Sequence, residues 1–245
     1  MRFSCFAFGF ALMACAASAQ AECKGMAQDG NTYTVCEVDP QLDRLSLFDA
    51  DVSGKPYGGF SNLVTALSIQ GKSLSFAMNA GMFGTDLKPI GLYVENGKQL
   101  HRVNRAGGAG NFHLKPNGIF YVAGGKAGVM ETDAYLRSGI KPDLATQSGP
   151  MLLINGAVHP KISPDGISAK IRNGVCVNDA GKIEFVISES SVTFYQFATM
   201  FRDGLRCKNA LFLDGSVSSL YAPELGRNDY LAIIGPMLGV TSPAK

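Results

Sequence analysis

The sequence lacks any stripe of basic side chains, and this absence excludes the simplest kind of nucleic-acid-binding protein. Its formal net charge is +2, from 22 Lys and Arg against 20 Asp and Glu, and both signs are mixed along the chain. Nucleic acid is bound largely through clustered positive charge, so we expect no nucleic-acid partner. The chain also has no run of like charge that would predict a disordered tail.

Metal-binding motifs are missing as well. The three histidines are scattered, at His101, His113 and His159, and the six cysteines form no CxxC pair. Structural zinc sites need Cys and His ligands at close, regular spacing. We therefore identify no cofactor. A divalent cation held by Asp side chains at a phosphate site is the alternative that stays open, and the metal ligands of such a site are unknown.

The sequence has no GxSxG motif, no internal repeat, no low-complexity tract and no linker. The missing GxSxG argues against a generic serine hydrolase, because that motif presents the nucleophilic serine on a strained turn. The missing linker favours one domain in a chain of 245 residues. Beyond the N-terminus, no segment is apolar over the length that a membrane span needs.

The first 21 residues, MRFSCFAFGFALMACAASAQA, have the features of a secretory signal peptide. Arg2 precedes a short apolar stretch, and the small residues that follow contain two A-x-A cleavage sites. We predict a signal peptide at 1–21, one domain at 22–245, and a periplasmic or secreted location. A lipoprotein with Cys15 as its lipidated N-terminus is the alternative.

Export changes what the cysteines predict. Removal of the signal peptide leaves four of them, and an even number in an oxidising compartment predicts two disulfides. Three pairings are formally available. Because the first two cysteines are near neighbours, we favour Cys23–Cys36 together with Cys176–Cys207.

Short apolar runs separated by turn residues predict a fold rich in β-structure. Four such turns are Asn96-Gly97, KPNG at 115–118, Asn155-Gly156 and NDAG at 178–181. The second turn places one strand at 112–114 and another at 119–122. Four turn-linked strand pairs predict an α+β fold, with a mixed, largely antiparallel sheet system and a few packed helices in a single domain.

One stretch has a strong helical pattern. In SSVTFYQFATMFRDGL, large apolar residues recur at spacings of 3, 4 and 4, which predicts a helix with its Phe residues in the core. Ser191 or Thr193 is expected to cap its start, and Gly204 to end it. Shorter helices are expected at 61–69 and after Thr132.

Several apolar strands end in a polar residue beside glycine. The clusters are NAGMFG at 79–84, GNF at 110–112, QSGP at 147–150, RNG at 172–174 and LDGS at 213–216. Each alone is typical of a turn. Together they bring amides, a guanidinium and a carboxylate to strand ends, where glycine lets a ligand approach the backbone. Such a set suits sugar hydroxyls and an anionic group.

In this order, the clusters and their neighbours resemble the phosphodiester glycosidase family. The matching segments are FAMNAGMFG…PIGLYVENGK, GNF…NGIFYV, ATQSGPMLLINGAV, IRNGVCV, VTFYQFATMFRD and NALFLDGSVSSLYAP. The family includes the catalytic domain of the lysosomal uncovering enzyme for mannose 6-phosphate tags. Its frequent LDGGGSS is LDGSVSS here, at 213–219. The resemblance implies hydrolysis of the glycosidic bond of a sugar-1-phosphodiester, which releases the sugar and a phosphate monoester.

The expected site residues come from these clusters. Asp214 is the first choice for a catalytic carboxylate, with an Asx-turn residue as the alternative. Arg172 is the phosphate candidate, with a surface ion pair as the alternative. The other expected substrate-binding residues are Asn79, Asn111, Gln147, Ser148, Gly149, Gly215 and Ser218. Glu189 is the second catalytic candidate, and Glu95 and Asp86 are its alternatives.

The expected partner is a sugar phosphodiester, which a cell-envelope glycan could provide. The altered loop at 213–219 leaves a second function open, that of a non-catalytic glycan- or envelope-binding protein on the same fold. Turnover of a chromogenic sugar phosphodiester separates the two functions.

Overall fold

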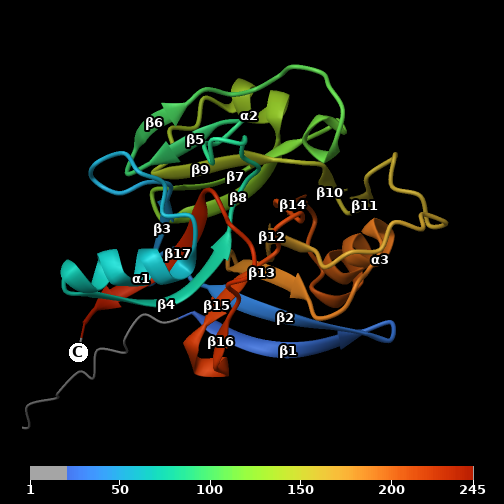
Figure 1. Ribbon diagram of the computed structural model, residues 1–245. Helices are drawn as coiled ribbons and strands as arrows, with labels where there is room; N and C mark the ends of the chain where they lie inside the picture. The colour runs from blue at the N-terminus through green and yellow to red at the C-terminus, as the bar shows by residue number, and fades with distance from the viewer. Residues whose placement is uncertain (1–20, 245) are drawn as a thin grey trace, which may run out of the picture.

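The computed structural model describes residues 21–244, which form three antiparallel sheets and three short α-helices (Figure 1). This architecture confirms the predicted α+β fold in a single domain. The predicted signal peptide lies outside the described residues except for Ala21, so both its existence and the boundary at residue 22 stay predictions.

The largest sheet has seven strands in the order β1-β2-β13-β12-β14-β10-β11. These strands are β1 (Glu22–Gln28), β2 (Asn31–Val38), β10 (Met151–Ile154), β11 (Ala157–Val158), β12 (Asn173–Val177), β13 (Ile183–Ser188) and β14 (Ala210–Phe212). The predicted turns Asn155-Gly156 and NDAG connect β10 to β11 and β12 to β13, so both hairpins are confirmed.

Two further sheets have five strands each, in the orders β16-β15-β4-β17-β3 and β6-β5-β9-β7-β8. The first contains β3 (Arg44–Phe48), β4 (Lys72–Asn79), β15 (Leu220–Ala222), β16 (Arg227–Asn228) and β17 (Met237–Pro243). The second contains β5 (Tyr93–Glu95), β6 (Lys98–His101), β7 (Gly118–Ala123), β8 (Lys126–Glu131) and β9 (Leu144–Ser148). The turn Asn96-Gly97 joins β5 to β6 as predicted.

The main core lies where the three sheets meet, and aromatic rings from all three pack there. The ring centroid of Phe185 on β13 is 5.1 Å from that of Phe76 on β4 and 5.7 Å from that of Phe120 on β7. All three side chains are fully buried. Rings at this distance contribute packing energy beyond that of their buried area, so the junction of the sheets is firmly held.

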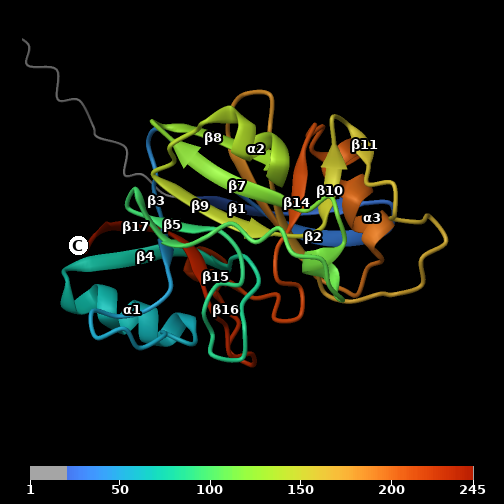
Figure 2. The same ribbon diagram turned by 90° about the horizontal axis from the view of Figure 1, so that it is seen from above.

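Two of the three helices, α1 and α3, lie at opposite ends of this core. Figure 2 shows α3 (Phe194–Thr199) beside β10 and β14 at one end, and α1 (Phe60–Ile69) at the other. Thr193 caps α3 in a capping box with Gln196, which selects Thr193 over Ser191 as the cap. The helix continues as a single π-helical turn (Met200–Gly204). The expected shorter helices are α1 and α2 (Thr132–Ser138).

One expected strand is wrong. Residues 112–114 fall mainly in a 3-10 helix, η1 (Asn111–His113), rather than in a strand that pairs across the KPNG turn. The backbone carbonyl groups of this segment are used locally. Phe112 O accepts from Asn117 Nδ2 at 2.9 Å, and Asn111 O accepts from Leu114 N at 3.1 Å. These local bonds stabilise the 3-10 turn, and β7 pairs with β8 and β9.

Both predicted disulfides are confirmed. Cys23–Cys36 links partner positions of β1 and β2, and Cys176–Cys207 links β12 to the segment after the π-helical turn. Two disulfides are typical of proteins outside the reducing cytosol. In the described part of the chain, no helix has both the length and the apolar character to cross a membrane.

A buried acid on β13 makes stability depend on pH. Glu184 lies opposite Glu37 on β2, and its carboxylate accepts from Asn178 Nδ2 at 2.7 Å. Burial, aided by the charge of Glu37, raises the pKa of Glu184 to about 7. The folded state therefore binds this proton more tightly than the unfolded state does. The free energy of unfolding therefore falls as pH rises from the ordinary pKa of Glu to the raised pKa of Glu184.

We therefore expect Glu184→Gln to raise the free energy of unfolding above pH 7. The gain is at most on the order of 3 kcal/mol, since the pKa rises from 4.5 to about 7 and one pKa unit corresponds to about 1.4 kcal/mol. Below pH 4.5, the ordinary value for this carboxyl, the variant and the wild type should converge. Denaturant unfolding at pH 4.5 and pH 8 measures both effects, with the exposed Asp165→Asn as control. Equal stabilities at pH 8 would contradict this assignment.

Candidate active site

Polar residues from two sheets meet at one point. Asn79 is the last residue of β4, and Asn173 is the first residue of β12. Asn173 Nδ2 donates to Asn79 O at 3.1 Å and to Asn79 Oδ1 at 3.0 Å, and so joins the two sheets. Asp214 follows β14, and Ser219 precedes β15. The loop between β14 and β15 therefore starts and ends beside these paired amides.

Asn79 fixes both ends of that loop. Its side chain is fully buried. Its Nδ2 donates to Asp214 O at 2.7 Å, and its Oδ1 accepts from Ser219 N at 2.9 Å as well as from Asn173. Both side-chain polar atoms thus have protein partners. The geometry gives Asn79, expected to bind substrate, a role in holding the loop.

Asp214 is nearly buried, with 8% of its surface exposed. Its Oδ1 accepts from Ser216 N at 3.1 Å, and its own N–H donates to Ala80 O at 3.1 Å. Burial raises the pKa of this carboxyl, although the bond from Ser216 opposes the shift. A Cβ at Gly215 would lie 2.2 Å from the Phe212 ring, so glycine is needed after Asp214. Asp214 therefore makes the contact of an Asx turn and also has the raised pKa that is typical of catalytic acids.

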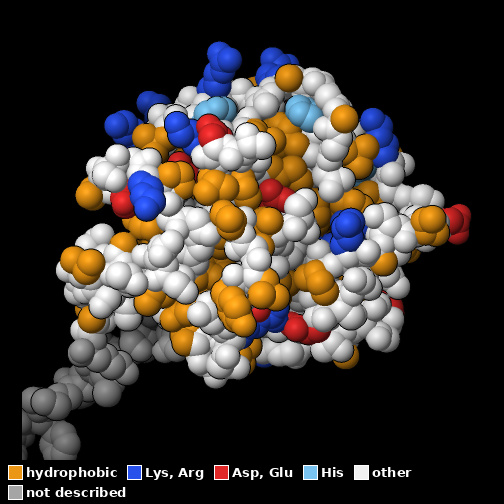
Figure 3. Space-filling view, viewed as in Figure 1, with side chains coloured by type: hydrophobic (Ala, Val, Ile, Leu, Met, Phe, Trp, Pro, Cys, Tyr) orange, Lys and Arg blue, Asp and Glu red, His pale blue; other side chains and the backbone are white. Residues whose placement is uncertain are grey.

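The loop borders a pocket of about 740 Å³. Its lining comes from η1, the segment before β12, the segment between β13 and α3, the end of β14 with the loop to β15, and the end of β16 with the segment after it. The lining residues are Asn111, Ala169, Lys170, Ile171, Arg172, Ser191, Phe212, Gly215, Ser216, Val217, Ser218, Ser219, Asn228, Asp229, Tyr230, Leu231 and Ala232. Figure 3 shows hydrophobic side chains gathered over β15, β16 and the adjoining surface. Both polar and apolar side chains therefore line the pocket.

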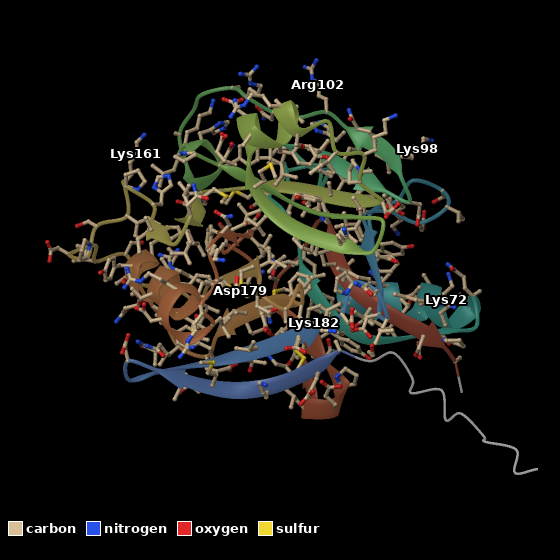
Figure 4. All side chains as sticks on the ribbon, turned by 180° about the vertical axis from the view of Figure 1, so that it is seen from behind. Lys72, Lys98, Arg102, Lys161, Asp179 and Lys182 are labelled. Carbon is tan, nitrogen blue, oxygen red and sulfur yellow. A yellow bond between two sulfur atoms is a disulfide. The ribbon has the colours of Figure 1, made fainter. Side chains whose placement is uncertain are left out.

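Arg172 is the unusual member of this lining. Basic side chains such as Arg102 and Lys161 point outward into solvent (Figure 4), whereas Arg172 is only 2% exposed. Its Nε donates to Val192 O at 2.9 Å and its Nη2 to Ser168 O at 2.7 Å. The guanidinium Cζ lies 3.6 Å from the centroid of the Phe194 ring. These contacts fix the plane of the guanidinium.

The charge of Arg172 has no protein counter-ion. Among residues 21–244, no carboxylate lies within ion-pair distance of it. Burial lowers its pKa to about 10, and the guanidinium is still charged at neutral pH. The alternative of a surface ion pair is therefore wrong. A buried cation without a partner is costly, and an anion bound in the pocket would compensate its charge. Lys170 lines the same pocket and would contact the same anion.

Three other expected residues line the same pocket, namely Asn111, Gly215 and Ser218. Ser218 Oγ donates either to Ile171 O at 3.2 Å or to Asn173 Oδ1 at 3.1 Å. The hydroxyl donates in either of these contacts, so its oxygen lone pairs stay available to a ligand donor. Asn111 belongs to η1 and is exposed to the pocket side of that turn.

The QSGP cluster lies outside this pocket lining and braces the third sheet. Gln147 Oε1 accepts from Leu92 N at 3.0 Å and from Asn104 N at 2.9 Å, and its Nε2 donates to Asn104 O at 2.9 Å. Ser148 is fully buried, and its Oγ has no hydrogen-bond partner among the described residues. A Cβ at Gly149 would lie 2.7 Å from Asn117 Cβ, which requires glycine there.

The carboxylate that lines the pocket is not the one that the sequence suggested. Glu189 does not line the pocket, and its Oε1 accepts from Thr34 Oγ1 at 2.6 Å and from Arg227 Nη1 at 2.7 Å. Asp229 does line the pocket. Its Oδ2 accepts from Arg227 Nη2 at 3.0 Å and from Leu220 N at 2.9 Å. Arg227 thus connects the two acids, and motif analysis of the sequence missed Asp229.

The alternatives Glu95 and Asp86 also lie outside this lining. Tyr93 OH donates to Glu95 at 3.0 Å, and burial raises the pKa of Glu95. Asp86 borders a separate groove beside His101. Within residues 21–244, no group of three or more His, Cys, Asp and Glu side chains is arranged to hold a metal ion.

Comparison with known proteins adds independent findings. The model of a family described as phosphodiester glycosidase matches residues 72–234. An Escherichia coli K12 protein, the uncharacterized protein YigE, is 38% identical over 190 residues, which cover 78% of this chain and 74% of that protein.

Solved structures share the fold. The zebrafish N-acetylglucosamine-1-phosphodiester alpha-N-acetylglucosaminidase catalytic domain, auto-inhibited by its pro-peptide, aligns with a TM-score of 0.60 and 17% identity over 90% of this chain and 82% of that chain. A hypothetical protein from Synechocystis aligns with a TM-score of 0.55 and 15% identity over 90% of this chain and 61% of that chain. At these identities, the two matches show a common architecture.

Proposed function

The chain belongs to the phosphodiester glycosidase family, and from this premise we propose that it hydrolyses the glycosidic bond of a sugar-1-phosphodiester. The observation that carries the proposal is the buried guanidinium of Arg172, which lines the pocket without a carboxylate partner. A phosphodiester supplies the missing negative charge. The two disulfides support a periplasmic or secreted location.

In the proposed reaction, Arg172 and Lys170 bind the phosphate. Arg172 Nη1 makes none of the bonds that hold the guanidinium in place, so its protons can serve the ligand. These cations stabilise the charge that collects on the phosphate as the bond between the sugar C1 and the phosphate oxygen breaks. The phosphate monoester departs with that oxygen.

Asp214 is the proposed acid–base carboxylate. Its raised pKa, caused by burial, favours a protonated form that can donate to the departing oxygen. Water supplies a hydroxyl to C1 and gives its other proton to a second carboxylate, which is assigned below, while Asp214 takes up a proton from solvent. The Asn79 bonds keep the loop that carries Asp214 in one position, which is the preorganisation such catalysis needs.

The first test is a screen of the purified protein against sugar-1-phosphodiesters, with release of sugar and monoester read by mass. We expect both products in equal amounts. Saturable binding of a diester without any turnover would contradict hydrolysis and select the glycan-binding alternative.

We assign the second carboxylate of the reaction to Asp229 in place of Glu189, because Asp229 lines the pocket. We expect Asp229→Asn to lower kcat by about 10²-fold or more, the range for removal of one acid–base group. Glu189→Gln keeps the hydrogen bond from Thr34 and should lower kcat by less than about tenfold, through a looser Arg227. Steady-state kinetics of both variants decides. A larger loss in Glu189→Gln would reverse the assignment.

A further inference from the structure

The rim of the pocket carries large apolar side chains that face solvent. Tyr230 is 77% exposed and Leu231 is 93% exposed, and both line the pocket. Ile233, two residues on, is 68% exposed. Single exposed apolar residues are ordinary on protein surfaces, but three within four residues at a pocket rim indicate a binding surface.

This rim, residues 230–233, is anchored at both ends. Before it, Asp229 N donates to Leu220 O at 3.0 Å, and the Asp229 carboxylate is held by Arg227. After it, Ile234 is buried, and its N–H donates to Gly58 O at 3.2 Å. The apolar side chains are therefore held outward by a fixed backbone, at the edge of the same pocket that holds the Arg172 guanidinium.

The chemistry of the rim selects one part of the substrate. A sugar ring presents hydroxyl groups, and of the rim side chains only Tyr230 has a polar atom for them. The phosphate matches Arg172 and Lys170 instead. What remains of a sugar phosphodiester is the alcohol on the far side of the phosphate, and an apolar rim beside a cationic pocket complements an apolar alcohol.

We propose that Tyr230 and Leu231 form a subsite for a long apolar alcohol on the phosphate, so that the substrate class is a lipid-linked sugar phosphodiester. This inference rests on the proposed function for the identity of the diester. The subsite itself can be tested without turnover, because an alkyl phosphate carries both of the groups that it would recognise.

The binding test compares dodecyl phosphate, below its micelle concentration, with inorganic phosphate by calorimetry. The variants are Tyr230→Ser/Leu231→Ser and, as a matched control, Leu42→Ser, which removes a side chain that is 71% exposed and lies outside the pocket lining. We expect dodecyl phosphate to bind the wild type at least about tenfold more tightly than inorganic phosphate, since burial of its alkyl chain against the rim adds to the contacts of the phosphate. The double variant should lose this difference, and the control should keep it.

The turnover test compares methyl and dodecyl diesters of glucose-1-phosphate. We expect the double variant to raise KM for the dodecyl diester about tenfold more than it raises KM for the methyl diester. Turnover of both diesters with equal kcat/KM would overturn the subsite and leave the proposed hydrolysis intact. Chain-dependent binding without any turnover would support the subsite and reject the hydrolysis.

A membrane is the other apolar surface that the rim could meet. Binding to phosphatidylcholine vesicles that is lost in the double variant, while dodecyl phosphate binds all three proteins equally, would overturn the alcohol subsite in favour of membrane docking. Equal affinity of the wild type for dodecyl and inorganic phosphate would overturn it outright.

Discussion

Replacement of Asp214 by Asn is expected to lower kcat for a sugar phosphodiester by about 10³-fold or more, because it removes the proposed acid–base group. Asn keeps the size of the side chain and retains an oxygen that can accept from Ser216 N, the bond that Asp214 makes at 3.1 Å. The exposed Asp179→Asn, on the surface seen from behind (Figure 4), is the matched control and should retain full activity.

The same variant separates catalysis from folding. Burial raises the pKa of Asp214, so the folded state prefers the protonated carboxyl. This preference stabilises the fold at low pH and is lost as pH rises through the raised pKa. At neutral pH, Asp214→Asn should therefore melt at the wild-type temperature or above it. Near-normal turnover in this variant would identify Asp214 as an Asx-turn residue, in which Asn is a good substitute.

The second large effect is expected at Arg172. Arg172→Met keeps much of the side-chain volume and removes the cation. We expect kcat/KM to fall about 10²-fold or more, since each hydrogen bond to a charged group contributes about 1.5–3 kcal/mol. Arg172→Lys keeps a charge but loses the planar fork, and its loss should appear mainly in KM.

The loss of activity in the Arg172 variants should not be accompanied by a similar loss in the free energy of unfolding. A buried cation without a carboxylate partner is costly, and its lowered pKa reflects that cost. Arg172→Met loses the bonds to Val192 O and Ser168 O but also removes the buried charge. We expect its free energy of unfolding to stay within about 1 kcal/mol of the wild type. An unfolded Arg172→Met protein with active Arg172→Lys would show that the guanidinium is structural.

The sequence predicted those elements of the fold that local patterns specify. Glycine turns with a left-handed backbone, such as Gly97 and Gly156, gave correct hairpins, and the Phe spacing gave α3. The strands β1 and β8 were missed because the alternation of apolar and polar side chains is weak in both: β1 is largely exposed, and each strand contains a glycine. Each nevertheless forms a hairpin with its neighbour in the chain, β1 with β2 across Asp29-Gly30 and β8 with β7 across Gly124-Gly125. These two turns were the local signals that the sequence analysis did not use.

The sequence predicted which residues lie near the site more reliably than it predicted what each of them does. The polar residues beside glycine do lie at strand ends, but their sequence looks alike whether a side chain faces a ligand or braces the scaffold. Asn79 and Gln147 use their amides within the protein, whereas Arg172 is left without a counter-ion. Asp229 was missed because its place in the pocket depends on a contact with Arg227 and on the path of the chain after β16.

The most direct test of the central claim is hydrolysis of a sugar-1-phosphodiester by the wild-type protein in ¹⁸O-labelled water. Cleavage of the bond between the sugar C1 and the phosphate oxygen predicts that the label enters the C1 hydroxyl of the released sugar and that the phosphate monoester stays unlabelled. Label in the phosphate product would contradict the account, because it would show that the protein breaks the phosphorus–oxygen bond.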